Sequence, residues 1–297
     1  MKPVRIALFA PGVKDRVMAK ALESGADAVI LDLEDSVPVA AKDVARTMVA
    51  AVIDGVAAAV NGSAPMIFVR TNASATGLLA DDLAAMVRPG LDALILPKVE
   101  SVEEIQGIAA ILSRLEAAKN MPDGTVSIIL MIESALGVYR CYDMIKASLR
   151  VAATCIGVAR DGDLQTDLGC SWSIEGTELM YARSKVLLDT RAAGNDVYPL
   201  DGVFSDLNDE AGLIQDTRLS ARLGYVGRTV IHPRQIAPVR AAYAVPDVEV
   251  AYYEKVVSEF SAVEKTGTAA ITIDGKLVDY AMYQRAQRVL ELAKLDH

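Results

Sequence analysis

The feature that most constrains the fold of this chain is a regular alternation of short apolar runs with longer amphipathic segments. The apolar runs predict strands at Ile6–Phe9, Ala28–Leu31, Met66–Val69, Ala93–Leu96, Ser127–Ile132, Val151–Gly157, around Val203 and at Thr229–Ile231. Helical patterns separate most of them, at Asp15–Ser24, Ala40–Val60, Leu78–Val87, Val102–Ala118, Gly137–Ala147, Ile174–Ala193 and Asp209–Leu223. Apolar strands that alternate with amphipathic helices are typical of parallel β/α architecture. Eight strands in roughly 235 residues predict an α/β fold of the (β/α)8 TIM-barrel type.

A doubly wound open sheet is the alternative fold for the same pattern. We consider it less well supported, because no glycine-rich G-x-G-x-x-G loop follows the first predicted strand.

The chain continues beyond the eighth predicted strand, and this part reads as an appended module. Pro246 precedes a predicted helix at Val248–Glu264, a break at Lys265–Gly267 and a hairpin over Ala270–Val278. The Asp274-Gly275 pair in that hairpin is a strong tight-turn signal. A final helix is predicted from Tyr280 to Leu295. We therefore expect a catalytic barrel over residues 1–245 and a C-terminal helix-hairpin-helix extension over residues 246–297 that packs on a neighbouring subunit.

Composition limits the classes of partner. Of the 297 residues, 52% are apolar and 23% are charged, which is enough apolar sequence for a large core. The net charge of −9 argues against nucleic acid or an anionic membrane as the main partner. Three cysteines without metal-ligand spacing suit a reducing compartment, and no apolar run is long enough to span a membrane. We therefore expect a cytoplasmic protein.

Three carboxylates follow the second predicted strand within four positions, at Asp32, Glu34 and Asp35. Like charges at the end of a buried strand require compensation by a cation, a metal or a network of donors, because their desolvation is costly. A helix N-terminus with acidic caps is the alternative explanation of this pattern.

Polar residues end the other strands as well, and the carboxyl ends of barrel strands carry the chemistry of such folds. In chain order these residues are Phe9, Asp32, Glu34, Arg70, Lys98, Glu133, Asp163, Asp201 and His232. Glu133 and Asp163 are carboxylates near the ends of adjacent strands with no histidine beside them, a donor set that suits Mg²⁺. Arg70 offers a planar fork to an oxyanion or carboxylate. The alternative is that Arg70 pairs with Glu133 or Asp32.

Several segments in order then carry a family resemblance. They are Ala7–Gly12, Asp27–Val37, Val69–Asn72, Leu96–Ser101, Ile132–Ala135, Asp201–Val203, Asp209–Gly212, Ile231–Ile236 and Gly275–Asp279. The chain resembles the citrate lyase β-subunit-like group of the HpcH/HpaI aldolase superfamily, which includes malyl-CoA and citramalyl-CoA lyases, from residue 5 to about residue 292.

The resemblance implies a Mg²⁺-dependent barrel with Glu133 and Asp163 as metal ligands. It implies that Phe9, Arg16, Lys20, Arg70 and Glu133 form the substrate-binding set, with Arg16 and Lys20 against the CoA phosphates. It also implies that Arg70 and Asp279 are catalytic, with Arg70 on the carbonyl or enolate oxygen and Asp279 donated by a neighbouring subunit as acid or base. An oligomer follows from that arrangement, either a trimer or a dimer of trimers.

One segment departs from the family pattern. The family usually has a small residue three positions before the metal aspartate, whereas this chain has Arg160, followed by Asp161-Gly162-Asp163. Asp161 is therefore an alternative to Asp163 as metal ligand. His232 precedes a proline, and we expect a structural turn there rather than a catalytic base.

The resemblance implies a lyase that cleaves a 3-hydroxyacyl-CoA thioester of the malyl, methylmalyl or citramalyl type into acyl-CoA and a 2-oxo acid. The alternatives are the β subunit of a citrate lyase complex acting on an acyl carrier protein thioester, and a hydrolase of the malyl-CoA thioesterase type.

Overall fold

The computed structural model describes residues 1–59, 64–194, 196–264 and 270–296. The chain forms two compact units, Met1–Val239 and Arg240–His297, which are described separately below. Within the described residues, no helix is long and apolar enough to cross a membrane.

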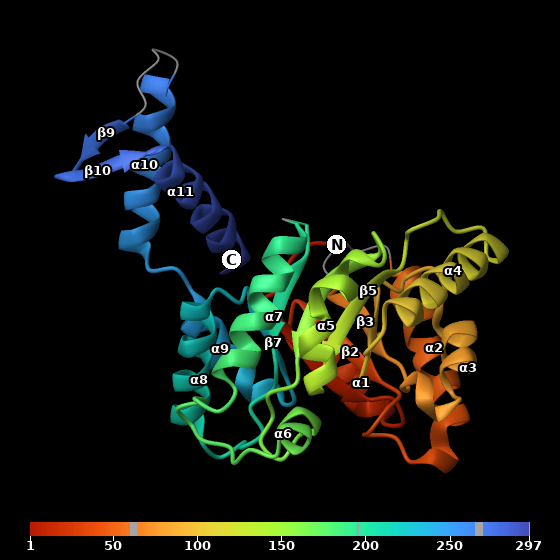
Figure 1. Ribbon diagram of the computed structural model, residues 1–297. Coiled ribbons are helices and arrows are strands. Elements are labelled where there is room, and N and C mark those ends of the chain that lie inside the picture. Colours follow the sequence, from red (N-terminus) through yellow and green to blue (C-terminus); the bar gives the residue numbers. More distant parts are fainter. Residues whose placement is uncertain (60–63, 195, 265–269, 297) are drawn as a thin grey trace. The chain divides into compact units, whose positions relative to one another are not determined.

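The first unit is a closed barrel of eight parallel strands, so the predicted TIM barrel is confirmed (Figure 1). The strands are β1 (Ile6–Pro11), β2 (Ala28–Asp32), β3 (Met66–Arg70), β4 (Ala93–Leu96), β5 (Ser127–Ile132), β6 (Val151–Ile156), β7 (Tyr198–Asp201) and β8 (Gly227–Val230). Each strand pairs with the next one along the chain, and β8 closes the barrel by pairing with β1. The register places Asp32 opposite Arg70 at the ends of β2 and β3, which fixes an acid beside a base at the barrel rim.

Helices follow the strands and surround the barrel (Figure 1). They are α1 (Asp15–Leu22), α2 (Lys42–Ala58), α3 (Leu79–Met86), α4 (Val102–Ala118), α5 (Ala135–Lys146), α6 (Asp163–Leu168), α7 (Met180–Ala193), α8 (Glu210–Leu223) and α9 (Ile236–Tyr243). Short 3₁₀ turns lie at Val39–Ala41, Ser74–Thr76 and Pro233–Gln235.

The helix α4 illustrates how local sequence specifies these elements. Ser101 caps its N-terminus, where the side-chain oxygen accepts a hydrogen bond from the Glu104 amide at 3.1 Å. Ile105, Ile108 and Leu112 recur at helical spacing and are buried against the barrel. The strands beneath are buried on both faces, which is why they read as continuous apolar runs rather than as alternating ones.

Two strand predictions were displaced. The seventh strand was expected around Val203, but it occupies Tyr198–Asp201. This run contains Pro199, a residue that is unfavourable in a central strand, so its sequence does not predict one. The eighth strand begins at Gly227 rather than Thr229 and contains Arg228, a charged residue that is fully buried because its guanidinium donates to the Gly202 carbonyl and to Asp216.

One helix prediction needs correction, and two helices were not predicted. The predicted helix at Ile174–Ala193 begins only at Met180, because Gly176 adopts a left-handed conformation at φ +66° and Ser173 and Glu178 close a turn. The short helix α6 was not predicted. The helix α9 was also missed, because Pro238 near its start hides the helical pattern.

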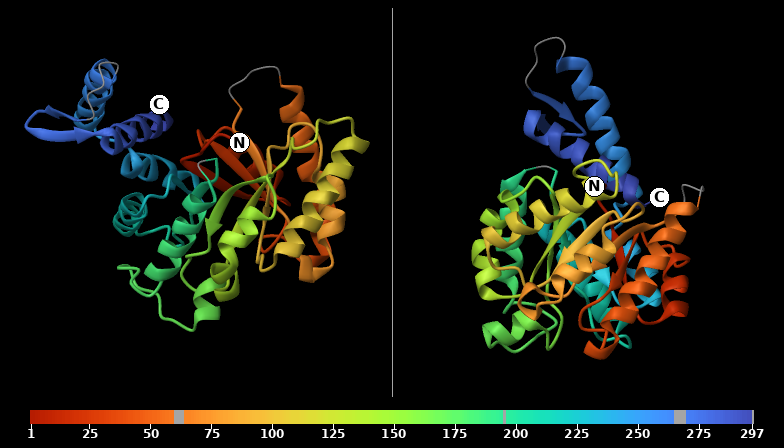
Figure 2. Two further views of the ribbon diagram at one scale, coloured as in Figure 1. Left: turned by 45° about the horizontal axis from the view of Figure 1, so that its top comes forward. Right: turned by 90° about the vertical axis from the view of Figure 1, so that its right-hand side faces the viewer.

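The second unit contains α10 (Asp247–Glu264), a hairpin of β9 (Ala270–Ile273) and β10 (Lys276–Asp279), and α11 (Tyr280–Ala293), followed by a 3₁₀ turn at Lys294–Asp296 (Figure 2). Asp274 and Gly275 form the turn of the hairpin, both with positive φ, as their sequence predicted. A small core of its own holds this unit together, formed by Val256, Phe260, Ile273, Val278 and Ala286. The predicted break at Lys265–Gly267 lies outside the described residues. Packing of this unit on a neighbouring subunit stays a prediction.

Candidate active site

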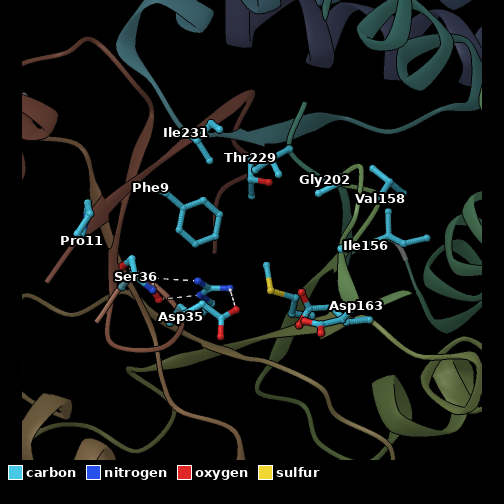
Figure 3. A pocket seen from close by; sticks show the side chains of 18 residues that line it. Phe9, Pro11, Asp35, Ser36, Ile156, Val158, Asp163, Gly202, Thr229 and Ile231 are labelled. Carbon is cyan, nitrogen blue, oxygen red and sulfur yellow. Dashed lines mark hydrogen bonds and ion pairs between the residues drawn. The ribbon is translucent and has the colours of Figure 1, made fainter. Parts of the chain in front are cut away.

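The carboxyl ends of the strands surround a cavity of about 380 Å³ at one end of the barrel (Figure 3). Its lining combines acidic residues, one guanidinium and a set of apolar side chains. The described lining residues are Phe9, Pro11, Asp32, Asp35, Ser36, Arg70, Met131, Glu133, Ile156, Gly157, Val158, Ala159, Gly162, Asp163, Gly202, Val203, Thr229 and Ile231.

Arg70 and Asp32 form a buried, bidentate ion pair at this rim. Arg70 Nε donates to Asp32 Oδ1 at 2.7 Å, and Nη2 donates to Oδ2 at 2.8 Å. Burial alone would raise the pKa of Asp32, but the hydrogen bonds and charge of Arg70 lower it below its usual value. The fork of Arg70 is therefore engaged by Asp32, as the alternative interpretation of the sequence expected, while the guanidinium still lines the cavity.

Phe9 and Glu34 lie on either side of this pair. The guanidinium carbon of Arg70 lies 5.0 Å from the centroid of the Phe9 ring, within the range of a cation–π contact. Nη1 of Arg70 approaches Glu34 Oε2 at 3.0 Å, although the contact lacks hydrogen-bond geometry. Phe9 thus lines the cavity, and its ring contacts the guanidinium of Arg70.

Lys98 links the acidic turn after β2 to α6. Its Nζ lies 3.4 Å from Glu34 Oε1 and 3.2 Å from Asp163 Oδ2. Burial alone would lower the pKa of Lys98, but Glu34 and Asp163 raise it, so the ammonium is held charged. Lys98 also has a positive φ of 54°, a conformation that costs energy for a residue with a side chain. The two ion pairs hold Lys98 there.

Glu133 is the acid with the most perturbed environment in the cavity. Burial, together with the charges of Glu34 and Asp163, raises its pKa to about 7 despite the opposing effect of Arg70. Its Oε2 is buried and has no hydrogen-bond partner among the described residues. The neighbouring strand accommodates it through Gly157, where a Cβ would lie 2.8 Å from Glu133 Cγ. A buried carboxylate oxygen without a hydrogen-bond donor fits the binding of a cation.

Asp163 is the first residue of α6 and lines the cavity, whereas Asp161 does not. The side chain of Asp161 is 83% exposed and that of Asp163 is 49% exposed. The helix α6 is tied to the start of α5, two residues after Glu133, because Asp167 Oδ2 accepts a hydrogen bond from the Ala135 amide at 2.6 Å. This geometry favours Asp163 over Asp161 as the partner of Glu133.

The donor set fits a hard divalent cation that keeps several waters. The described residues contain no cluster of three or more histidine, cysteine, aspartate or glutamate side chains arranged as metal ligands. Glu133 and Asp163 supply two carboxylates, and Mg²⁺ is commonly bound through one or two carboxylates, with water or substrate completing its shell.

The remaining candidate residues lie outside the cavity. Arg16 and Lys20 are exposed on α1, the helix that follows β1. His232 caps the turn at Pro233–Gln235, where its Nδ1 accepts a hydrogen bond from the Arg234 amide at 3.1 Å, in agreement with a structural turn. Asp279 caps α11, and its Oδ1 accepts from the Met282 amide at 2.9 Å. The capping contact does not test the acid–base role implied for Asp279.

Asp201 ends β7 but belongs to a buried network behind the cavity wall. Arg183 Nη2 lies 3.1 Å from Asp201 Oδ2 and donates to Asp216 at 2.8 Å. Arg228 donates to Asp216 as well, and its Nε and Nη2 both donate to the Gly202 carbonyl, at 3.0 and 2.7 Å. Two arginines and two aspartates thus compensate one another and fix the wall segment at Gly202.

Sequence reasoning assigned no site role to Lys98, Ser36, Gly157 or Gly202. Lys98 is one of the polar residues at the strand ends. The sequence feature that could have indicated its role is the excess of acidic over basic residues at these ends. Ser36 donates its backbone amide to Asp32 Oδ2 at 3.1 Å and so helps to fix the Arg70 partner. The two glycines carry no signal in one sequence, because their role depends on what lies across the barrel.

Comparisons with known proteins agree with this geometry. The family model described as HpcH/HpaI aldolase/citrate lyase matches residues 5–233, and the one described as C-C bond lyase of the TIM-barrel fold matches residues 183–296. Citrate lyase subunit beta of Leuconostoc mesenteroides subsp. cremoris is 35% identical over 294 residues, covering 99% of this chain and 94% of that protein. Human mitochondrial citramalyl-CoA lyase is 28% identical over 298 residues, covering 98% of this chain and 86% of that protein.

A solved structure extends the likeness to three dimensions. The CitE protein of Mycobacterium tuberculosis, in complex with magnesium, acetoacetate and coenzyme A, superposes with a TM-score of 0.75 at 28% identity and 98% coverage of both chains. RipC of Yersinia pestis gives a TM-score of 0.66 at 26% identity, over 83% of this chain and 98% of that one.

The closed barrel, its acidic rim and these matches define the class of the protein, which is a carbon–carbon lyase of the TIM-barrel fold. The chain belongs to the HpcH/HpaI aldolase/citrate lyase family, as its sequence segments indicated.

Proposed function

We propose that this chain is a Mg²⁺-dependent lyase that cleaves a 3-hydroxyacyl-CoA thioester of the malyl, methylmalyl or citramalyl type. The products are an acyl-CoA and a 2-oxo acid, and the reaction is reversible. The observation that carries the proposal is the buried Glu133 carboxylate, without a hydrogen-bond donor at Oε2, beside Asp163 in a cavity at the strand ends. The CitE structure with magnesium, acetoacetate and coenzyme A supports it.

Glu133 and Asp163 are the residues that would hold the cation. When bound, Mg²⁺ supplies Lewis-acid chemistry that lowers the pKa of a coordinated hydroxyl and neutralises developing negative charge. Burial and the charges of Glu34 and Asp163 raise the pKa of Glu133, so its ionised form would be favoured by a cation held there.

The reaction needs a group that stabilises negative oxygen while the bond breaks. The substrate hydroxyl gives its proton to the acid–base group that is assigned below, and the bond between the carbinol carbon and the α-carbon of the thioester breaks. The electron pair moves into a thioester enolate, which is then protonated on carbon. Arg70 lines the cavity as a fixed cation, because Asp32 and the Phe9 ring hold its guanidinium, and we assign it to the developing charge.

The carbon of the enolate must receive a proton from an acid. We propose Asp279 of a neighbouring subunit in a trimer or dimer of trimers, and we place Arg16 and Lys20 against the CoA phosphates. The support is the family resemblance of the Gly275–Asp279 segment and the exposure of the two basic side chains on α1.

A second candidate is the β subunit of a citrate lyase complex, acting on a citryl group carried by an acyl carrier protein. The relatives that favour it are citrate lyase β subunits of Leuconostoc mesenteroides subsp. cremoris and Escherichia coli, at 35% and 34% identity. This candidate requires partner subunits, which co-purification would detect.

One assay separates these functions. Purified protein is incubated with malyl-, methylmalyl-, citramalyl- and citryl-CoA and with the citryl thioester of an acyl carrier protein, with and without Mg²⁺, and glyoxylate, pyruvate and oxaloacetate are measured. A lyase releases a 2-oxo acid and leaves the thioester intact, whereas a thioesterase releases free thiol. Activity only with the acyl carrier protein thioester would select the citrate lyase subunit. Full turnover after chelation would refute the metal-dependent mechanism.

A further inference from the structure

We infer that the substrate carries a small apolar substituent on its carbinol carbon and no second free carboxylate, so that the preferred reaction releases pyruvate. This inference rests on the proposed lyase function and selects among its substrates. The evidence is the distribution of charge and apolar surface around the cavity.

The charged half of the lining is dominated by acid. Among the described lining residues, Asp32, Asp35, Glu133 and Asp163 stand against one cation, Arg70. The formal charge of these five side chains is therefore −3, and a bound divalent cation brings it to −1. A substrate with one carboxylate beside its hydroxyl already adds a negative charge that needs the metal. A second carboxylate has no cation left to pair with it.

Neighbouring cations are committed elsewhere. Lys98 is paired with Glu34 and Asp163, and it is not among the described lining residues. The guanidinium of Arg160 lies 5.6 Å from the centroid of the Trp172 ring and does not line the cavity. Neither side chain is placed to receive a distal carboxylate.

One stretch of the cavity lining is apolar. Figure 3 shows Ile231, Thr229, Gly202, Val158 and Ile156 along this stretch, with Asp163 next to Ile156 and with Phe9, Ser36 and Asp35 facing it from the other side of the cavity. Val203 belongs to the same apolar wall. The hydroxyl of Thr229 is directed to the Asp201 carbonyl at 3.4 Å.

This wall is also fixed in position. A Cβ at Gly202 would lie 2.4 Å from the Ile156 carbonyl oxygen and 2.9 Å from Val158 Cγ2. Arg228 holds the Gly202 carbonyl from behind with two hydrogen bonds. Because this segment is held in place, its apolar side chains offer a substituent on the carbinol carbon apolar contact and no ionic partner. A wall of this kind discriminates one methyl group by about 10–200-fold and rejects an unpaired carboxylate more strongly.

The experiment compares acyl groups on one carrier. We expect kcat/KM for citramalyl-CoA to exceed that for malyl-CoA by about tenfold and that for citryl-CoA by about 10²-fold or more. Equal or faster cleavage of citryl-CoA, with release of oxaloacetate, overturns the inference and leaves the lyase function intact. Absence of any 2-oxo acid from every thioester refutes the proposed function itself.

A binding measurement that needs no turnover and a pair of variants test the inference further. In calorimetry with Mg²⁺ present, pyruvate should bind more tightly than oxaloacetate, and the reverse order contradicts the inference. The variant Val203→Arg places a cation in the apolar wall and should move the citryl-to-citramalyl ratio toward citryl. Val44→Arg makes the same change at an exposed position of α2 and should leave the ratio unchanged. If folded Val203→Arg protein keeps the wild-type ratio, the wall does not select the substituent.

Discussion

Replacing Glu133 by glutamine should inactivate the enzyme and at the same time stabilise the metal-free protein. The pKa of Glu133 is raised from 4.5 to about 7 by burial. Its proton is therefore bound more tightly in the folded chain than in the unfolded chain, so folding stability falls as pH rises from about 4.5 to about 7 and stays reduced above that range. The shift of about 2.5 units corresponds to about 3 kcal/mol at pH 8, at 1.36 kcal/mol per unit.

Glutamine removes that cost because it is neutral at every pH. In excess chelator at pH 8, Glu133→Gln should raise the free energy of unfolding by about 3 kcal/mol, or the thermal midpoint by roughly 5–10 °C. At pH 5, where the wild-type carboxyl is mostly protonated in the folded state, the gain should fall below about 1 kcal/mol. Mg²⁺ should stabilise the wild type at pH 8 but not the variant.

Thermal melts of both proteins at the two pH values, with and without Mg²⁺, measure all of these quantities. Asp161→Asn is the matched control, since that carboxylate is exposed and outside the cavity, and its melting should differ little from wild type. A chelated Glu133→Gln protein that melts at or below the wild type at pH 8 would show that burial does not destabilise this carboxylate. A gain of the same size at pH 5 would assign the effect to packing rather than to charge.

Three other predictions concern residues of different kinds. Arg70→Lys should lower the rate by about 10²-fold or more, because lysine keeps the charge but loses the bidentate contact with Asp32. Steady-state kinetics measure this effect, and a wild-type rate would show that Arg70 serves only as a structural ion-pair partner. Asp279→Asn should keep the cap of α11, because asparagine caps helices as well as aspartate, so its stability should change little, whereas Asp279→Ala should cost about 1 kcal/mol. If Asp279 is the acid, Asp279→Asn should lose about 10²–10⁴ in rate, and mixed oligomers of Asp279→Asn and Glu133→Gln subunits should recover activity; no recovery in verified mixed oligomers would rule out a shared site. Native protein at pH 8 should be alkylated by iodoacetamide at Cys170 only, because burial raises the pKa of Cys141 and of Cys155 to about 12. Mass spectrometry identifies the labelled cysteines, and labelling of Cys155 would indicate an open barrel.

The barrel was predictable from the sequence because parallel strands that are buried on both faces consist of uninterrupted apolar residues. Six of the predicted strands lie on strands of the structure with similar ends, and the two that were displaced contain Pro199 and Arg228. Neither residue suits a central strand by its own propensity. Arg228 is tolerated because distant groups satisfy its guanidinium, namely Asp216 on α8 and the Gly202 carbonyl.

The candidate site was predictable to the extent that its residues sit at strand ends. Asp32, Arg70 and Glu133 lie there because the register of the barrel aligns those ends. The pairing of Arg70 was left open between Glu133 and Asp32, and only the β2–β3 register selects Asp32. The role of Lys98 depends on α6, a helix of six residues that carries too little periodic sequence to be recognised.

The close approach of Gly157 to Glu133 has a consequence for the variation that this fold can accept. With 2.8 Å between a Cβ at position 157 and Glu133 Cγ, alanine at 157 is compatible only with a displaced or shorter acid at 133. Positions 133 and 157 are therefore coupled, so that a change at one requires a change at the other. A sequence of this fold that carries a larger residue at the position of Gly157 is expected to have moved or abandoned its buried carboxylate, so the glycine serves as a marker when candidates for this chemistry are chosen.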